Sequence, residues 1–257
     1  MLLSSLQLKG FRNVAKQIQA NSRARAELLD VPRPLTTVDV VIFSIRDHRL
    51  HVLLVQRRAG ADEPFPGVWA LPGGIVDIIR DKDLEACAVR KLKEKTGMVS
   101  PYLEQLGSWG SAQRDPRGWS ATHAYFALMS AVATTGSPAT DAQWFPINAG
   151  GVKPELAFDH GDILEAAVQR LRSKVEYTSL PAYLMPEEFT LPDLQRVYEI
   201  VLDRPLEKSA FRTRILAADL VEPVAGMRRG PNRPAQLYRL KKARFPVYFA
   251  RTFNPPE

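Results

Sequence analysis

The chain has 257 residues, of which 45% are hydrophobic and 25% charged, and it carries a net charge of +7. This length and composition suit one large or two modest globular domains and exclude a chain that is disordered throughout. Its single cysteine, Cys87, cannot form an internal disulfide, and no apolar run approaches the roughly 18 residues that cross a bilayer. We therefore expect a soluble, cytoplasmic protein without a membrane partner, in which Cys87 fills space in the core.

Residues 1–33 are predicted to form a helical extension ahead of the first domain. The first 26 residues hold five basic residues and no acidic one, a composition that a transit peptide would share. The apolar spacing favours the plainer interpretation of an amphipathic helix, whose apolar positions are Leu3, Leu6, Phe11, Val14 and Ile18.

Two strands rich in Val, Ile and Leu are predicted over residues 35–45 and 50–56, joined by a turn at residues 47–49. The second strand ends at Arg57 and Arg58. These two arginines either bind a phosphate group or simply end an apolar strand in water, and the sequence alone leaves both interpretations open.

A Gly-Gly turn and a helix follow at residues 73–97. The helix is predicted over residues 84–96 and ends at Gly97, the usual stop residue. The sequence RKLKEKTG of residues 90–97, preceded by FPGVWALPGG at residues 65–74, resembles the Nudix box. In that family the loop and helix hold a divalent metal against the pyrophosphate of a substrate. Without the preceding residues, a lysine-rich surface helix after a glycine turn is the simpler interpretation.

The acidic residues of the box are mostly replaced. Residues three and four apart on a helix share a face, which lets the family's glutamates converge on one cation. Here Lys91 and Lys95 stand where the family has Glu, and only Glu94 is in register. The acid expected upstream is Arg80 or Lys82, depending on the direction of counting. Substitutes with a different spacing are Asp77, Asp81 and Asp83.

Strands are predicted over residues 103–112 and 120–129, with the loop QRDPRG between them at residues 113–118. The loop resembles a segment of Nudix proteins that act on ADP-ribose, and of their regulatory relatives, where it borders the bound ligand. Turn chemistry alone favours a plain Asp-Pro turn with exposed arginines. A further helix is predicted to run to about residue 175, and His160 near its start is assigned no role beyond packing or capping.

Residues 176–188 contain two prolines and no helical period, which indicates a connector between two domains. Beyond it, Thr190 and Asp193 are predicted to cap a helix whose apolar face is formed by Leu191, Leu194, Val197, Tyr198 and Val201. A second helix is predicted from about residue 207 to 219. Its inward residues are Phe211, Ile215 and Leu216, and its outward residues are Lys208, Ser209, Arg212 and Arg214.

The last quarter of the chain is basic. Residues 189–257 hold 13 Lys and Arg against 7 Asp and Glu, and residues 220–224 are expected to pair with residues 235–240 in a hairpin. Two helices and a basic hairpin are the elements of a winged helix, which binds DNA, whereas a solvated hairpin is the plainer alternative. The sequence RRGPNRPAQLYR at residues 228–239 resembles the wing of the Nudix-related regulators of NAD metabolism, the NrtR family.

The resemblance covers roughly residues 34–240 and implies an α+β fold, a Nudix α/β/α sandwich with a mixed sheet followed by a winged helix-turn-helix domain. The implied domains are the extension at residues 1–33, a ligand-sensing domain at 34–175, the connector at 176–188, and the DNA-binding domain with a tail at 189–257. The implied function is a repressor of NAD biosynthesis or salvage genes that responds to ADP-ribose or a related nucleotide. Because operator symmetry mirrors protein symmetry, we expect a homodimer on double-stranded operator DNA.

We expect the diphosphate of the effector to bind basic side chains directly, without a cofactor. The predicted ligand-binding residues are Arg57, Arg58, Gly74, Lys91, Lys95, Arg114 and Arg117. The predicted DNA-binding residues are Lys208, Ser209, Arg212, Arg214, Arg228, Arg229 and Arg233. No catalytic or metal-binding residue is assigned.

Two alternatives remain for the function. One is an active Nudix hydrolase, similar to ADP-ribose pyrophosphatases, with an accessory nucleic-acid-binding domain. It needs at least two metal ligands, for which Glu94 is in register and Glu85 is a possible helper. The other is a constitutive DNA-binding protein whose Nudix domain only dimerises.

Overall fold

The computed structural model describes residues 17, 32–60, 63–97, 100–131, 141–228, 234–241 and 246–249. The predicted N-terminal helix falls almost entirely outside these residues. The first part of the fold contains β1 (Leu35–Arg46), β2 (Arg49–Gln56), β3 (Trp69–Ala70), β4 (Gly73–Ile75), α2 (Leu84–Thr96), β5 (Tyr102–Ser111), β6 (Ser120–Leu128), β7 (Ala142–Pro146) and α3 (His160–Val175). The second part contains η2 (Leu180–Leu184), β8 (Phe189–Thr190), α4 (Leu191–Leu202), α5 (Lys208–Ala217), β9 (Val221–Arg228) and β10 (Ala235–Leu240). None of the helices in these ranges is long and apolar enough to span a membrane.

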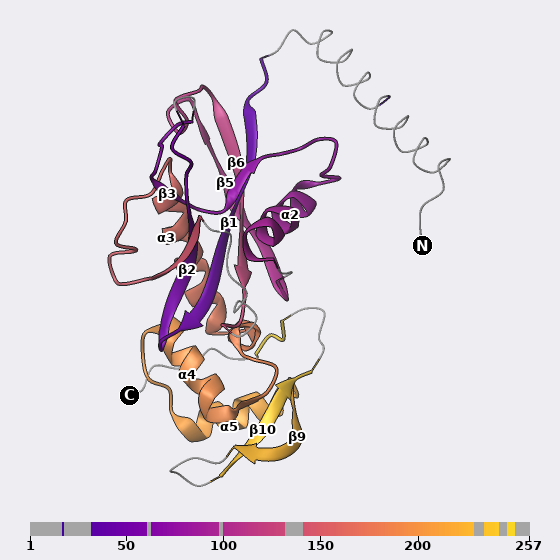
Figure 1. Cartoon of the computed structure of the whole chain (residues 1–257). Helices are drawn as coiled ribbons and strands as arrows, with labels where there is room; N and C mark the ends of the chain where they lie inside the picture. The colour runs from indigo at the N-terminus through magenta and orange to yellow at the C-terminus, as the bar shows by residue number, and fades with distance from the viewer. Residues whose placement is uncertain are drawn as a thin grey trace.

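A seven-stranded mixed sheet forms the centre of the first part. Its main path runs β3-β2-β1-β6-β5, with β4 paired to β1 and β7 paired to β2. The strands β1 and β6 are parallel, from Leu35 beside Ser120 to Phe43 beside Leu128, whereas the other pairings are antiparallel. The helices α2 and α3 cover opposite faces of this sheet (Figure 1). The predicted α/β/α sandwich with a mixed sheet is confirmed.

The alternation of side chains along β1 explains why both faces are covered. Successive side chains of a strand point to opposite faces. In β1, Val38, Val40 and Ile42 pack with α2, whereas Val41 and Phe43 pack with α3. All five side chains are fully buried, and burying each contributes about 1.5–3 kcal/mol. Burial on both sides makes β1 the central strand of the domain.

The helix α2 forms over the predicted residues. Asp83 caps its amino end, because Oδ1 accepts a hydrogen bond from the Ala86 amide at 2.7 Å. Gly97 ends the helix in the left-handed conformation, with φ of 73°. Cys87 is fully buried, as predicted for core filling. Burial also raises the pKa of the Cys87 thiol to about 11, so the thiol stays protonated at neutral pH.

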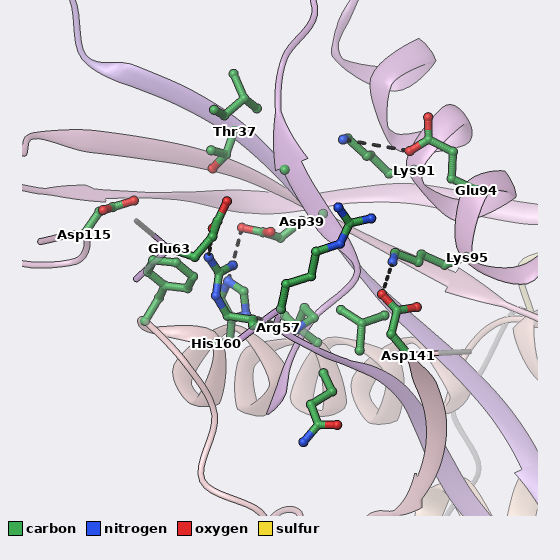
Figure 2. A pocket seen from close by; sticks show the side chains of 18 of the residues that line it. Thr37, Asp39, Arg57, Glu63, Lys91, Glu94, Lys95, Asp115, Asp141 and His160 are labelled. Carbon is green, nitrogen blue, oxygen red and sulfur yellow. Dashed lines mark hydrogen bonds and ion pairs between the residues drawn. The ribbon is translucent and has the colours of Figure 1, made fainter. Parts of the chain in front are cut away.

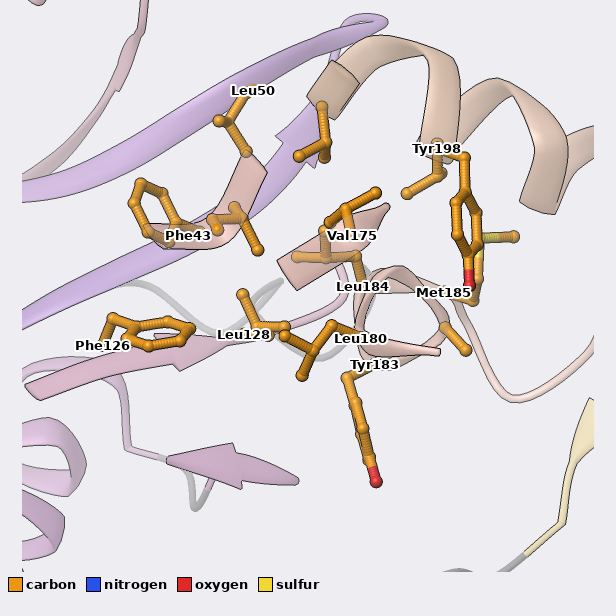
Figure 3. Packing of buried hydrophobic residues seen from close by; sticks show 14 of the residues in the cluster. Phe43, Leu50, Phe126, Leu128, Val175, Leu180, Tyr183, Leu184, Met185 and Tyr198 are labelled. Atoms are coloured by element: carbon orange, nitrogen blue, oxygen red, sulfur yellow. The ribbon is translucent and has the colours of Figure 1, made fainter. Parts of the chain in front are cut away.

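The connector at residues 176–188 contains a short helix, although its sequence shows no helical period. Residues 180–184 form the 3-10 helix η2, with Pro181 in its first turn, where a missing amide hydrogen costs least. All five of its residues are buried, and Figure 3 shows Leu180 and Leu184 close to Leu128 of β6. The segment is therefore part of the hydrophobic core and packs the two parts of the fold together.

The chain returns to this junction after the wing. The Ser179 amide donates a hydrogen bond to the Val247 carbonyl at 2.9 Å, and the Phe249 amide donates to the Tyr177 carbonyl at 2.8 Å. The rings of Tyr177 and Tyr248 stack with their centroids 6.2 Å apart. The tail thus runs antiparallel to the start of the connector and packs against the junction between the two parts of the fold.

The second part is the predicted winged helix. Thr190 and Asp193 form the capping box of α4, in which Asp193 Oδ2 accepts from the Thr190 amide at 2.9 Å and Thr190 Oγ1 accepts from the Asp193 amide at 3.3 Å. The helix α5 packs on α4 through Tyr198 and Phe211, whose ring centroids are 5.2 Å apart. The strands β8, β10 and β9 form a sheet in that order. The orientation predicted for Leu216 is wrong, since this residue of α5 is 40% exposed.

Candidate functional site

A cavity of about 520 Å³ opens between α2, the strands β1 and β2, and the start of α3 (Figure 2). All seven residues predicted to bind the ligand line it, although they come from four separate stretches of the chain. The charged part of the lining consists of six basic side chains, Arg57, Arg58, Lys91, Lys95, Arg114 and Arg117, and five acidic ones, Asp39, Glu63, Glu94, Asp115 and Asp141. The charges of the cavity are therefore nearly balanced.

The two lysines of the box helix line the cavity from α2 (Figure 2). Lys91 lies against Gly74, where a Cβ atom would come within 2.9 Å of the Lys91 Nζ. The backbone of Gly74 also has φ of 145°, which side chains disfavour. Lys91 Nζ is 3.9 Å from a Glu94 carboxylate oxygen, and Lys95 Nζ is 2.7 Å from Asp141. The glycine turn thus makes room for the Lys91 ammonium group.

The acidic residues near the box do not suit a divalent cation. Glu94 Oε1 accepts a hydrogen bond from Arg90 at 3.0 Å and lies 3.9 Å from Arg80, and Lys91 is close to its other oxygen. Three cations around one carboxylate oppose the entry of a 2+ ion. Glu85 does not line the cavity. Within the described ranges, no group of three or more His, Cys, Asp and Glu side chains is placed to hold a metal ion.

The upstream aspartates, which the sequence offers as substitute acids, stabilise the loop instead. Buried Asp81 accepts from Arg90 Nε at 2.7 Å and Nη2 at 2.6 Å, and from the Asp77 amide at 2.9 Å. The Arg90 guanidinium holds the pKa of Asp81 well below its usual value. Asp77 accepts from amides of its own turn, and Asp83 caps α2. None of the three aspartates lines the cavity.

The arginines at the end of β2 both line the cavity. Arg57 Nη2 pairs with Glu63 at 2.7 Å, and its Nε donates to the Pro64 carbonyl at 2.7 Å. Its guanidinium also lies 4.8 Å from the centroid of the Phe158 ring. Arg58 is exposed. Of the two interpretations left open by the sequence, this geometry favours a role for Arg57 in the site.

The loop at residues 113–118 is not the plain exposed turn that its turn chemistry favours. Arg114 is buried, and its Nε and Nη2 donate to the two carboxylate oxygens of Asp159 at 2.9 and 2.7 Å. Arg117 pairs with buried Asp115 through Nε at 3.0 Å and Nη2 at 2.8 Å. This pairing holds the pKa of Asp115 below its usual value. The loop therefore forms an ordered wall of the cavity.

Sequence reasoning misses the carboxylate of Asp39 on the buried side of the cavity and its contact with His160. His160 Nδ1 accepts a hydrogen bond from the Leu71 amide at 2.9 Å, so the neutral ring carries its proton on Nε2, which lies 3.5 Å from Asp39 Oδ2. Asp39 also accepts from Thr122 Oγ1 at 2.7 Å. Burial favours the neutral acid, yet His160, Thr122 and Arg114 hold the pKa of Asp39 below its usual value.

The signal for Asp39 is present in the sequence as the acid within the run TTVDVVIF at residues 36–43. A carboxylate in the middle of a buried strand requires partners from elsewhere in the fold. Gly73 leaves space for the Asp39 side chain, because a Cβ atom at this position would come within 2.0 Å of Asp39 Oδ1. His160 is a packed histidine, as expected, but it packs inside the cavity.

The candidate DNA-binding surface is the exposed side of α5. Lys208, Ser209 and Arg212 are exposed there, as predicted. Thr213 and Leu216 extend the same surface. In a winged helix this element enters the major groove, where hydroxyl groups and apolar side chains contact base edges. The exposed Leu216 therefore belongs to the candidate interface.

The other predicted DNA-binding residues are placed differently. Arg214 does not point outward as predicted. Its half-buried side chain lies on the packed side of α5, where the guanidinium is 5.8 Å from the centroid of the Phe249 ring. Arg228 at the end of β9 is exposed and forms an ion pair with Asp193 at 2.5 Å. Two further wing residues lie outside the described residues, Arg229 and Arg233.

Comparison with known proteins agrees with this architecture. Residues 35–167 match the family model of the NUDIX domain, and residues 181–240 match that of the NrtR DNA-binding winged helix domain. The chain is 46% identical over 235 residues to the ADPR responsive transcriptional repressor NtrR of Acinetobacter baylyi, a match that covers 91% of this chain and 92% of that protein.

Two solved structures of NrtR from Shewanella oneidensis are also similar. The crystal structure of NrtR complexed with a 27mer DNA has a TM-score of 0.78 at 42% identity, covering 85% of this chain and 99% of that chain. The NUDIX domain of NrtR complexed with ADP ribose has a TM-score of 0.50 at 44% identity, covering 59% of this chain and 97% of that chain. By sequence and by fold, the chain belongs to the NrtR family, as a Nudix domain joined to an NrtR-type winged helix.

Proposed function

We propose that this chain is a DNA-binding transcriptional repressor whose Nudix cavity binds ADP-ribose. Its relative in Acinetobacter baylyi is named an ADPR responsive transcriptional repressor, and NrtR of Shewanella oneidensis has been crystallised with DNA and, as its NUDIX domain, with ADP ribose. In this proposal the protein acts in the cytoplasm on NAD biosynthesis or salvage genes, and ADP-ribose releases the operator.

The meeting of distant basic residues in one cavity carries the proposal. Arg57, Lys91, Lys95 and Arg114 come from the end of β2, from α2 and from the loop after β5, yet they line one space of about 520 Å³. Pockets for small ligands commonly have about 300–1,000 Å³. ADP-ribose offers two adjacent phosphate groups, which Arg binds through two parallel hydrogen bonds and Lys binds as a point charge.

The acidic partners of these residues indicate how the ligand enters. Arg57 pairs with Glu63, and Lys95 pairs with Asp141. The side chains of Glu63 and Asp141 are 51% and 34% exposed, so each can turn into water when a phosphate takes its place. One anion then replaces another, and the cations keep a partner throughout. Binding by this exchange requires no cofactor.

The same charges argue against hydrolase activity. Metal-assisted hydrolysis needs acidic groups gathered on a cation. Glu94, the acid in register with the box, contacts Arg80, Arg90 and Lys91, and Lys91 stands where the family has Glu. A catalytic metal would have to displace these cations.

Calorimetry and a hydrolysis assay test the ligand and the chemistry separately. ADP-ribose titrated into the full chain in EDTA is expected to bind, and ADP-ribose incubated with Mg²⁺ or Mn²⁺ is expected to remain intact. Absence of binding, or a strict need for Mg²⁺, contradicts the proposal. Turnover that Glu94→Gln abolishes would identify an active hydrolase instead.

Operator binding requires a separate measurement. A duplex selected from a random pool by the protein is expected to be released by ADP-ribose in fluorescence anisotropy, and its half-sites are expected to form a palindrome read by a homodimer. Light scattering measures the mass of the free and bound protein. DNA binding that is indifferent to ADP-ribose would favour a constitutive DNA-binding protein.

A further inference from the structure

Asp159 occupies the N-cap position of α3 without capping the helix. An Asp at this position usually accepts a hydrogen bond from one of the first free amides of the helix. Here both of its carboxylate oxygens accept from Arg114, at 2.9 and 2.7 Å. The Arg114 guanidinium is therefore the present donor to Asp159. The alternative donors are the amides of Gly161 and Asp162, which the carboxylate reaches only when the Asp159 backbone turns from φ of −98° and ψ of 21° to the extended conformation of a capping residue.

A diphosphate in the cavity competes with Asp159 for Arg114. The Arg114 side chain is 5% exposed and lines the cavity, and its planar fork fits a phosphate as well as a carboxylate. Asp39, 3.7 Å from Arg114, is held in place by Thr122 and His160. Among the described residues, the Asp159 carboxylate bonds only to Arg114, and its side chain is 18% exposed. Of the two carboxylates, Asp159 is the one that gives way.

The helix α3 connects this point to the winged helix. It has 16 residues, a length of roughly 24 Å, and Figure 1 shows it running behind the sheet towards α4. Near its far end, Arg172 Nε donates a hydrogen bond to the Val201 carbonyl of α4 at 3.2 Å. Val175 is fully buried in the core that includes η2 and α4. Because this end of α3 is closely packed with α4, a displacement of α3 moves α4 as well, since packed cores do not deform continuously.

A second link joins the same helices. Thr178 Oγ1 donates to the Lys174 carbonyl at 2.6 Å, and the Tyr198 hydroxyl of α4 donates to the Thr178 carbonyl at 3.0 Å. Tyr198 in turn contacts Phe211 of α5, the helix that carries the candidate DNA-binding surface. Contacts therefore run without a break from the cavity to that surface.

We propose that Asp159 is the switch that couples the cavity to the winged helix. In one state Asp159 holds Arg114. In the other state the diphosphate holds Arg114, Asp159 caps α3, and the shift of α3 resets α4 and α5. Each state has its own contacts at the cavity, as a ligand-driven change requires. The inference rests on the proposed function, because it needs a diphosphate ligand and operator DNA.

The test compares Asp159→Asn with Asp162→Asn in the full chain. Asn caps a helix as well as Asp does but lacks the charge that holds Arg114, so Asp159→Asn is expected to resemble the ligand-bound state. Asp162 is an exposed acid in the first turn of the same helix, which makes its substitution a matched control. Operator affinity is measured with and without saturating ADP-ribose.

In the wild-type protein and in Asp162→Asn, ADP-ribose is expected to weaken operator binding by about tenfold, a usual magnitude for coupled sites. In Asp159→Asn this factor is expected to fall below about twofold, with operator binding already weaker in the free variant. An Asp159→Asn protein that keeps the wild-type factor contradicts the switch. If ADP-ribose does not change the operator affinity of the wild-type protein, the proposed function is wrong, and the switch with it.

Hydrogen exchange provides a measurement on the wild-type protein. Saturating ADP-ribose is expected to slow exchange at the amide of Gly161 or Asp162 several-fold, because Asp159 then accepts from one of them. In Asp159→Ala, which has no acceptor, this slowing is expected to disappear. Unchanged exchange at both amides of the saturated wild-type protein contradicts the switch even if a variant fails to fold.

Discussion

The buried ion pair between Asp81 and Arg90 predicts that Asp81→Asn destabilises the protein. The two side chains are 1% and 16% exposed, and Asp81 accepts two hydrogen bonds from Arg90. Removing one partner of a buried pair costs about 3–5 kcal/mol when the other is left alone. Arg90 keeps its contact with Glu94 at 3.0 Å, so we expect the free energy of unfolding to fall by about 2–3 kcal/mol.

Asp83→Asn is the matched control, because it makes the same change two residues away. The Asp83 side chain is 52% exposed and caps α2 through one hydrogen bond to the Ala86 amide. Asn caps equally well. The free energy of unfolding is therefore expected to change by less than about 0.5 kcal/mol.

Urea unfolding followed by circular dichroism measures both variants. With a slope of about 3 kcal/mol per molar urea, the loss in Asp81→Asn lowers the midpoint by about 1 M. The pKa of Asp81 is lowered on folding by Arg90, so its stabilisation is present above the unfolded value of about 4 and is lost as the pH falls below it. The difference between wild type and Asp81→Asn is thus expected to shrink in acid. A loss no larger than that of Asp83→Asn refutes the reasoning.

Lys91→Glu restores the family's acid in the cavity and is expected to weaken ADP-ribose binding in EDTA at least about tenfold; calorimetry measures this, with exposed Lys93→Glu as control. Cys87 is expected to resist a thiol reagent until the protein unfolds. A Cys87 thiol that reacts as fast in the native protein as in the unfolded protein contradicts this. Because burial raises the pKa of Cys87 to about 11, the free energy of unfolding is also expected to fall as the pH rises from about 9 to 11. Replacing Lys208 and Arg212 by Ala is expected to lower the slope of log operator affinity against log salt concentration by about two, one for each lost phosphate contact. Anisotropy titrations measure this slope, and an unchanged slope means that the DNA does not contact these two residues.

The elements that the sequence predicts correctly are those set by near neighbours along the chain. Asp83 and Gly97 bound α2 through contacts within four residues, and the capping box of Thr190 and Asp193 spans three. The alternation of apolar residues along β1 likewise sets which side chains face each helix. Local chemistry of this kind needs no knowledge of the rest of the fold.

The features that the sequence does not reveal depend on distant residues. Asp39 and His160 meet only because β1 and the start of α3 lie side by side. The balanced charge of the cavity arises because Glu63 and Asp141 arrive there from other loops. The rotation of α5 is also set from outside, since the tail residue Phe249 lies over Arg214. The spacing of apolar residues within the ten residues of α5 cannot predict a contact with a residue of the tail.

The return of the tail to the connector limits how the DNA specificity of this protein can be engineered. Val247 and Phe249 form backbone hydrogen bonds with Ser179 and Tyr177, so the C-terminal domain does not end with β10. A chimera that replaces everything after residue 188 would leave these groups unpaired, at about 1–3 kcal/mol for each buried group. A foreign recognition surface is therefore better grafted onto α5 alone, with residues 246–249 retained.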